Sequence, residues 1–118
     1  MGDYKQLEVW QLAHHLACRI HGATQAMPTG FAELRDQLRR ASLSIPTNLA
    51  EGSGRWKDAD FARYVNIAIG SAAEVESLLL FAGEAEAIGA PLGQELLGDA
   101  IRVRQMLARL RAALQKRK

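Results

Sequence analysis

The sequence predicts an all-α protein that folds as an antiparallel up-down-up-down four-helix bundle. Three observations predict this fold. Apolar residues recur every three or four positions along four segments, which is the period of an amphipathic helix, and no segment alternates as a strand does. Proline or glycine separates the segments and leaves short connections, which favour antiparallel neighbours. The chain of 118 residues has an ordinary length for a single domain, expected over 1–118.

The first two helices are expected over 4–26 and 31–51. Asp3 lies where an N-cap is expected for the first helix, and its apolar stripe steps by four, three and four residues: Val9, Ala13, Leu16 and Ile20. Pro46 falls inside the second helix and cannot donate a backbone hydrogen bond, so we expect a kink there. Gly52 is expected to help end this helix.

The last two helices are expected over 59–88, with Asp58 as N-cap, and over 91–115. The third carries a seam with heptad spacing over Phe61, Tyr64, Ala68, Ser71, Val75, Leu78, Ala82 and Ala85. Several apolar residues lie outside the predicted stripes, namely Leu7, Trp10, Ile69, Ala72 and Leu79. A helix with a second apolar face usually buries it, often against another subunit, so these residues predict an oligomer.

Charge is distributed unevenly along the chain, although its total is only +2. Residues 58–90 carry six acidic and one basic side chain, for a net charge of −5. Residues 91–118 carry seven basic and two acidic side chains, for a net charge of +5. Two arrangements are open. The third and fourth helices pair acid to base within the bundle, or the basic side chains stay exposed for an anionic partner.

No group of residues has the spacing of a catalytic or metal site, so we expect no enzyme activity, no cofactor and no metal. The three histidines are expected to be packed or interfacial, and Cys18 to be buried and inert. One cysteine cannot form an internal disulfide, which suits a reducing cytoplasm. Glu74 and Glu76 interrupt the most apolar stretch, and no apolar leader is visible, so we expect a cytoplasmic protein with no membrane segment.

Basic residues form rows on the predicted fourth helix. Arg102, Arg109 and Lys116 repeat every heptad, and so do Arg104, Arg111 and Lys118. Arg55-Trp56-Lys57 forms a basic–aromatic cluster that can hold phosphate and stack a base. The rows are typical of a surface that binds RNA or DNA. They are also explained by the dipole at a helix C-terminus or by pairing with the acidic helix.

Three segments, 7–13, 37–52 and 61–76, resemble the bacterial four helix bundle protein family, which includes proteins encoded in intervening sequences of large-subunit ribosomal RNA genes. The most specific segment has a proline inside a helix, followed by Asn-x-Ala-Glu-Gly. The residues that match the family motif are Arg39, Arg40, Ser44, Pro46, Asn48, Glu51, Gly52 and Arg63. A buried pair between Glu51 and an arginine, or a ligand site, would explain the motif equally well.

The resemblance implies a ring-shaped homopentamer. The sequence is also similar to the accessory protein of diversity-generating retroelements, which implies a nucleic acid and a protein as partners. We therefore expect a non-enzymatic oligomer that binds RNA or DNA, with a protein-binding scaffold as the alternative. The candidate nucleic-acid-binding residues are Arg35, Arg39, Arg40, Arg55, Lys57, Arg63, Arg102 and Arg109, and the motif residues expected to be structural are Pro46, Asn48, Glu51 and Gly52.

Overall fold

The computed structural model describes residues 3–117. Its elements in chain order are a short 3₁₀ helix η1 (Tyr4–Gln6), α1 (Glu8–Gln25), α2 (Ala32–Ser53), α3 (Asp58–Glu84) and α4 (Ala90–Lys116). Residues 3–117 contain no strand. The all-α prediction is therefore confirmed, with four long helices as expected.

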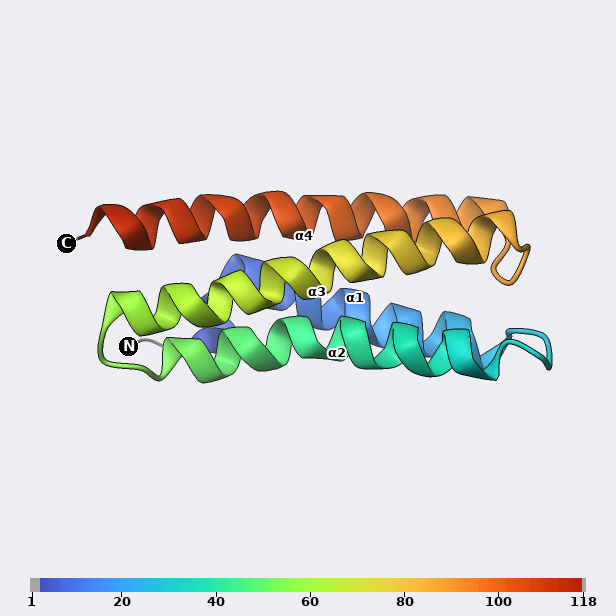
Figure 1. Cartoon of the computed structure of the whole chain (residues 1–118), viewed down its shortest axis with the longest axis horizontal. Helices are drawn as coiled ribbons and strands as arrows, with labels where there is room; N and C mark the ends of the chain where they lie inside the picture. Colours follow the sequence, from blue (N-terminus) through green and yellow to red (C-terminus); the bar gives the residue numbers. More distant parts are fainter. Residues whose placement is uncertain (1–2, 118) are drawn as a thin grey trace.

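Each helix runs back along the one before it, so that the chain goes up, down, up and down along a bundle of 48 × 20 × 18 Å (Figure 1). α2 packs against α1 and α3, and α4 packs against α3 and, less extensively, against α1. The α2–α3 connection and the C-terminus lie at one end of the bundle (Figure 1). The α1–α2 and α3–α4 connections lie at the other end.

The core is a single cluster of aliphatic side chains that all four helices contribute. The predicted stripe of α1 is buried as expected, and so are most of the apolar positions predicted for α2 and α4. The largest fully buried apolar side chains are Leu16, Ile20, Leu38, Ile45, Leu49, Val65, Val75, Leu96, Val103 and Leu107. The burial of these side chains against one another holds the long helices together, because isolated helices are marginally stable in water.

The helix ends differ from the sequence prediction at two places. The first helix is interrupted at Leu7, whose backbone is extended, so the chain makes one 3₁₀ turn capped by Asp3 before α1 begins. α3 ends at Glu84 rather than at residue 88. The amide of Ala87 turns back to the carbonyl of Ala82 at 2.8 Å, and Glu86 adopts a left-handed φ of 60°. This turn buries Ala87 and Ile88 over the end of the core.

Asp58 was expected to cap α3, but the structure places it inside the first turn, with no side-chain cap at Lys57. Both oxygens of Asp58 instead accept hydrogen bonds of 2.9 Å from Arg117. This interaction fastens the C-terminal end of α4 to the start of α3.

The buried face of α3 is shifted from the predicted seam. Ala68, Val75 and Ala82 are buried as expected, but Val65, Ala72 and Leu79 accompany them in place of Tyr64, Ser71 and Leu78. The latter three are half-buried. The shift arises because α3 packs between α2 and α4, so its contact face is wider than one seam. α3 is also long and apolar enough to cross a membrane by length and composition alone, which is weak support for such a role.

This shift removes part of the reason for predicting an oligomer. Ala72 and Leu79, expected to form a second apolar face, belong to the core of one chain. Leu7, Trp10 and Ile69 are half-buried against that same core. Other apolar side chains remain exposed, as described below.

Candidate nucleic-acid interface

Gly52 lies where α2 and α3 approach each other closely. A Cβ at this position would lie 2.7 Å from the Cβ of Tyr64 and 2.8 Å from Cδ1 of Phe61. Gly52 lies within α2, so its role is to permit close packing rather than to end the helix as expected. This close packing is the physical reason for the structural role predicted for Gly52.

The proline-containing turn of α2 is supported by side-chain hydrogen bonds. The helix continues through the buried Pro46, although the proline cannot donate to the carbonyl of Ser42. Nearby, Thr47 Oγ1 donates to the carbonyl of Leu43 and Asn48 Nδ2 donates to the carbonyl of Ser44, each at 2.8 Å.

These hydrogen bonds extend to the neighbouring helix. Asn48 Nδ2 also lies 3.0 Å from Ser44 Oγ, which in turn shares a hydrogen bond of 2.9 Å with Ser71 Oγ of α3. Asn48 and Ser44 thus support α2 around Pro46 and join it to α3, which is a structural role for these motif residues.

Glu51 holds the loop that follows α2. Its carboxylate accepts a hydrogen bond of 3.2 Å from Arg55, which also donates to Tyr64 Oη at 2.6 Å and lies over the Tyr64 ring. Of the two explanations left open for the motif, the pair is the one for which a contact is present: Glu51 pairs with Arg55. Both side chains are exposed, however, so this pair is not a buried one.

The next residue, Trp56, is 90% exposed and lies between Arg55 and Lys57, which is exposed too. A large aromatic side chain with so little packing has its faces free for a ligand. The loop therefore presents an aromatic ring and two cationic side chains at one end of the bundle (Figure 1).

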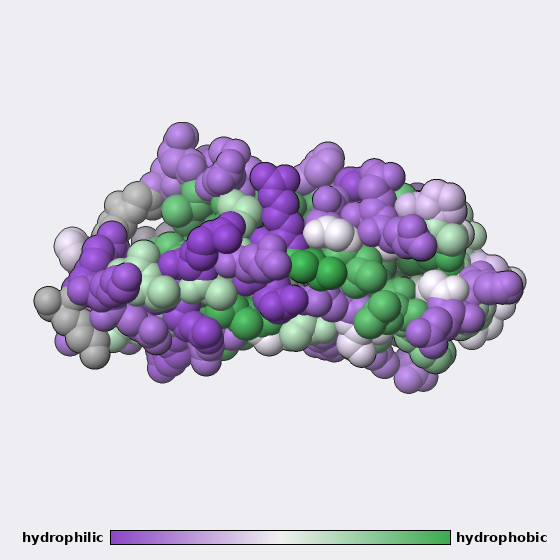
Figure 2. Space-filling view, turned by 90° about the horizontal axis from the view of Figure 1, so that it is seen from above, coloured by the Kyte–Doolittle hydropathy of each residue, from purple (hydrophilic) through white to green (hydrophobic). Residues whose placement is uncertain are grey.

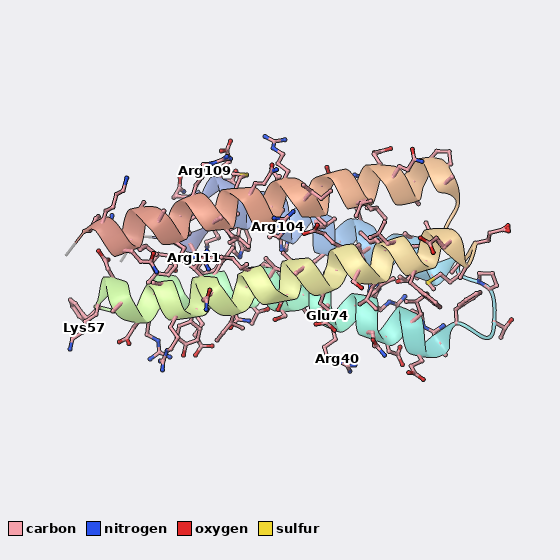
Figure 3. All side chains as sticks on the ribbon, turned by 45° about the horizontal axis from the view of Figure 1, so that its top comes forward. Arg40, Lys57, Glu74, Arg104, Arg109 and Arg111 are labelled. Carbon is pink, nitrogen blue, oxygen red and sulfur yellow. The ribbon has the colours of Figure 1, made fainter. Side chains whose placement is uncertain are left out.

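The two basic rows of α4 have different environments. Arg104 forms an ion pair with Glu76 of α3, and this carboxylate raises the pKa of the Arg104 guanidinium through its hydrogen bond and its charge. Arg111, one heptad later, donates instead to the amide oxygen of Asn66 at 2.7 Å. Figure 3 shows Arg104 and Arg111 on the side of α4 that faces α3, with Arg109 on the other side. Lys118, the last member of this row, lies outside the described residues.

The other row stays free of acidic partners. Arg102, Arg109 and Lys116 are exposed, and among residues 3–117 no carboxylate lies within ion-pair distance of them. Acid–base pairing between α3 and α4 and exposure of the basic side chains therefore both occur, each in one row. α3 neutralises Arg104 of the first row through Glu76, whereas the row that begins with Arg102 faces outward.

Several candidate residues therefore gather at one end of the molecule, which we term the basic end. It comprises the α2–α3 connection, the start of α3 and the end of α4, which the Asp58–Arg117 interaction brings together. Its exposed cationic residues include Lys57, Arg63, Arg109 and Lys116, together with Arg55 and Arg117, which are paired with Glu51 and Asp58. The opposite end presents the exposed acidic side chains of Glu33, Asp36, Glu84, Glu86 and Glu95.

The three candidate arginines of α2 lie apart from the basic end. Arg39 is half-buried, and its guanidinium donates to Thr24 Oγ1 at 2.8 Å and to the carbonyl of His21, so it ties α2 to α1. Arg35 is half-buried and lies 3.6 Å from Asp36. Arg40 is exposed and projects from α2 in Figure 3. Of these three, Arg40 alone has the exposure and freedom that the nucleic-acid hypothesis needs.

Cys18 does not follow the sequence interpretation. Cys18 is exposed rather than buried, and its Sγ lies 3.9 Å from Nε2 of His14. His14 is also exposed and stacks on Trp10 at 4.7 Å between ring centroids. The i, i+4 spacing of His14 and Cys18 is the signal in the sequence for this contact. No group of three His, Cys, Asp or Glu in residues 3–117 is placed to hold a metal.

Exposed apolar side chains occur mainly on the outer faces of α2 and α3. Leu43 is 60% exposed, Phe81 56%, Leu80 51% and Ile67 48%. Figure 2 shows the strongest apolar colouring on the half of the visible face nearest the α3–α4 connection. Apolar side chains exposed in one chain are typical of protein–protein contacts.

Two residues gain importance only from the structure. Trp56 was recognised in a basic cluster, but its full exposure could not be foreseen, because an aromatic residue after a helix often folds back onto the core. Arg111 belongs to a heptad row in the sequence but is not among the candidate nucleic-acid-binding residues predicted from it. The sequence places Arg111 one heptad after Arg104, and this spacing is the signal that the two share a face of α4. That Arg104 meets Glu76 whereas Arg111 meets Asn66 depends on how α3 and α4 are aligned.

Comparison with known proteins supports this fold. The chain has 24% identity to a Bacteroides thetaiotaomicron protein of unknown function from the S23 ribosomal protein family, whose crystal structure superimposes with a TM-score of 0.75. The match covers 84% of this chain and 94% of that one. A comparison with curated proteins finds no match. The model of the 23S rRNA-intervening sequence protein family matches residues 5–109, most of the chain, and the protein therefore belongs to this family.

Proposed function

We propose that this protein is a non-enzymatic, oligomeric helical bundle of the cytoplasm that binds RNA or DNA through its basic end. The observation that carries this proposal is Trp56, 90% exposed between two cationic side chains. A solvent-exposed tryptophan offers a stacking platform to any base, and the adjacent Lys57, which has no acidic partner among the described residues, attracts phosphate. This combination suits single-stranded nucleic acid without a fixed sequence.

The exposed row on α4 supplies the second part of the surface. Arg102, Arg109 and Lys116 have no acidic partner among the described residues, so each is free to neutralise a phosphate. Arg63 adds a further exposed cation at the start of α3. Because cationic side chains outnumber carboxylates at the basic end, the bundle would approach a polyanion with this end first.

Oligomerisation would strengthen such a surface. Several copies of one weak patch on a single nucleic-acid strand raise the overall affinity without any new contact, because the later binding events become intramolecular. Exposed Leu80 and Phe81 support a contact between chains, and the family resemblance implies a ring of five. This ring is part of the proposal.

The test is a binding titration of labelled single-stranded RNA and DNA against the wild-type protein at several salt concentrations. The logarithm of the affinity should fall linearly with the logarithm of the salt concentration, because binding releases condensed counterions. No binding at low salt, or binding that salt does not weaken, would overturn the proposal.

A protein-binding scaffold is the second candidate, and exposed Leu43, Ile67, Leu80 and Phe81 favour it.

Light scattering of the wild type and of a Leu80→Ser/Phe81→Ser variant examines the apolar face directly. The oligomer proposal predicts an assembly in the wild type and smaller species in the variant. Trp56→Ser is the matched control, since it removes an exposed apolar side chain at the other end. A wild-type monomer contradicts the oligomer.

A further inference from the structure

A polar cleft lies between the start of α3 and the end of α4, beside the basic end. Its volume is about 410 Å³, and it is lined by Ala59, Ala62, Arg63, Asn66, Arg111 and Gln115. The two alanines leave space, and the side chains of Asn66, Arg111 and Gln115 bring one guanidinium group and two carboxamides to one place. The guanidinium of Arg63 lies over the ring of Tyr64, 5.6 Å from its centroid. No carboxylate is among these lining residues.

Within residues 3–117, no carboxylate lies within ion-pair distance of Arg111 in this cleft. Arg111 is half-buried, and its Nη1 donates to the amide oxygen of Asn66, which orients the guanidinium without neutralising it. Arg104, on the same row of α4, has its charge compensated by Glu76. A partly buried cation that has lost some of its hydration and has no counter-ion favours an anionic ligand.

The two carboxylates in the first turn of α3, those of Asp58 and Asp60, do not neutralise Arg111. Asp58 is engaged by Arg117, which binds both of its oxygens at 2.9 Å and holds the pKa of the Asp58 carboxyl below its ordinary value. Asp60, in the first turn of α3, is not among the residues that line the cleft. The cleft therefore keeps its positive charge.

We propose that this α3–α4 cleft binds a phosphoryl group, with Arg111 as the charged ligand and Asn66 and Gln115 as neutral donors. Guanidinium groups match the geometry of phosphate oxygens, and amide donors complete such sites without adding charge. In the context of the proposed function, on which this assignment rests, the phosphoryl group belongs to the backbone of RNA or DNA held at the basic end.

The test compares Arg111→Gln with Arg104→Gln in a titration against a short labelled single-stranded RNA. Both variants lose one positive charge from the same row. Arg111→Gln should weaken binding about fivefold, the upper range for a partly exposed charge contact, and should lower the salt slope by about 0.7. Arg104→Gln should leave both nearly unchanged, because its charge is already compensated. Arg111→Lys keeps the charge and should restore the slope. Circular dichroism checks that each variant is folded.

A second measurement separates the backbone from free phosphate as the source of the ligand. Inorganic phosphate is titrated into the ¹⁵N-labelled wild type, and the side-chain amide signals of Asn66 and Gln115 are followed. Saturable shifts there, together with RNA binding that depends on Arg111, support the assignment to the backbone. Shifts without any RNA binding support a site for free phosphate and overturn the proposed function instead. Equal losses in Arg111→Gln and Arg104→Gln, or no amide shifts, overturn the cleft site.

Discussion

Gly52 and Tyr64 approach so closely that a Cβ on residue 52 would lie 2.7 Å from the Cβ of Tyr64. This contact fixes where α2 ends against α3, and the loop with Trp56 starts from that point. The position of the candidate nucleic-acid interface thus depends on the absence of a side chain at residue 52.

Replacing Gly52 with alanine should destabilise the bundle by about 2 kcal/mol, because overpacked side chains force neighbouring atoms to move. Urea unfolding measures this loss. Gly98→Ala is the matched control: Gly98 lies inside α4, and a Cβ there would meet nothing within 4 Å, so alanine should add up to about 1 kcal/mol of stability. Equal effects of the two substitutions would show that the close approach at Gly52 is unimportant.

Glu86 has a φ of 60° in the turn between α3 and α4, a conformation that costs a residue with a side chain about 1 kcal/mol. Glu86→Gly should relieve this cost and raise the melting temperature by about 4 °C. Glu84→Gly, two residues earlier at the end of α3, should bring no gain, since its backbone is helical. A melting temperature for Glu86→Gly at or below that of the wild type would exclude this source of strain.

Asp58 should titrate below the ordinary range, because its hydrogen bonds with Arg117 favour the ionised form and hold its pKa down. Its stabilising contribution is therefore present above the ordinary aspartate pKa and is lost as the pH falls through the lowered value. A ¹³C NMR titration of the Asp58 carboxyl measures this directly. Arg117→Gln should return the pKa towards the ordinary value; an unchanged titration in that variant would contradict the interaction.

The exposed row of α4, formed by Arg102, Arg109 and Lys116, predicts that two double variants of equal net charge differ in their affinity for RNA. Arg102→Gln/Arg109→Gln should weaken RNA binding and lower the salt slope by about 1.4, since each contact contributes about 0.7 for a single strand. Arg19→Gln/Arg104→Gln loses the same charge, but Arg19 is paired with Glu95 and Asp99, and Arg104 with Glu76. This control should bind almost as the wild type does. If both variants bind equally weakly, net charge rather than position governs affinity.

The sequence allowed the fold to be predicted well, because helix period and breaking residues are local signals. Its errors lie where packing decides. Leu79 and Ala72 share the core because α3 is held from two sides, and α3 stops at Glu84 because the following residues cover the core. The candidate site was predicted in composition but not in arrangement. A charge count cannot tell Arg39, fixed by Thr24, from Arg102, which faces solvent.

The central claim is that the basic end binds nucleic acid with Trp56 as a stacking platform, and the fluorescence of this residue tests it most directly. The chain has two tryptophans, and Trp10 is half-buried against Tyr4 and His14, so a Trp10→Phe variant makes Trp56 the sole reporter. Adding single-stranded RNA at low salt should quench its emission to a saturable limit, and added salt should reverse the effect. RNA that binds without altering Trp56 emission, or does not bind at all, would contradict the account.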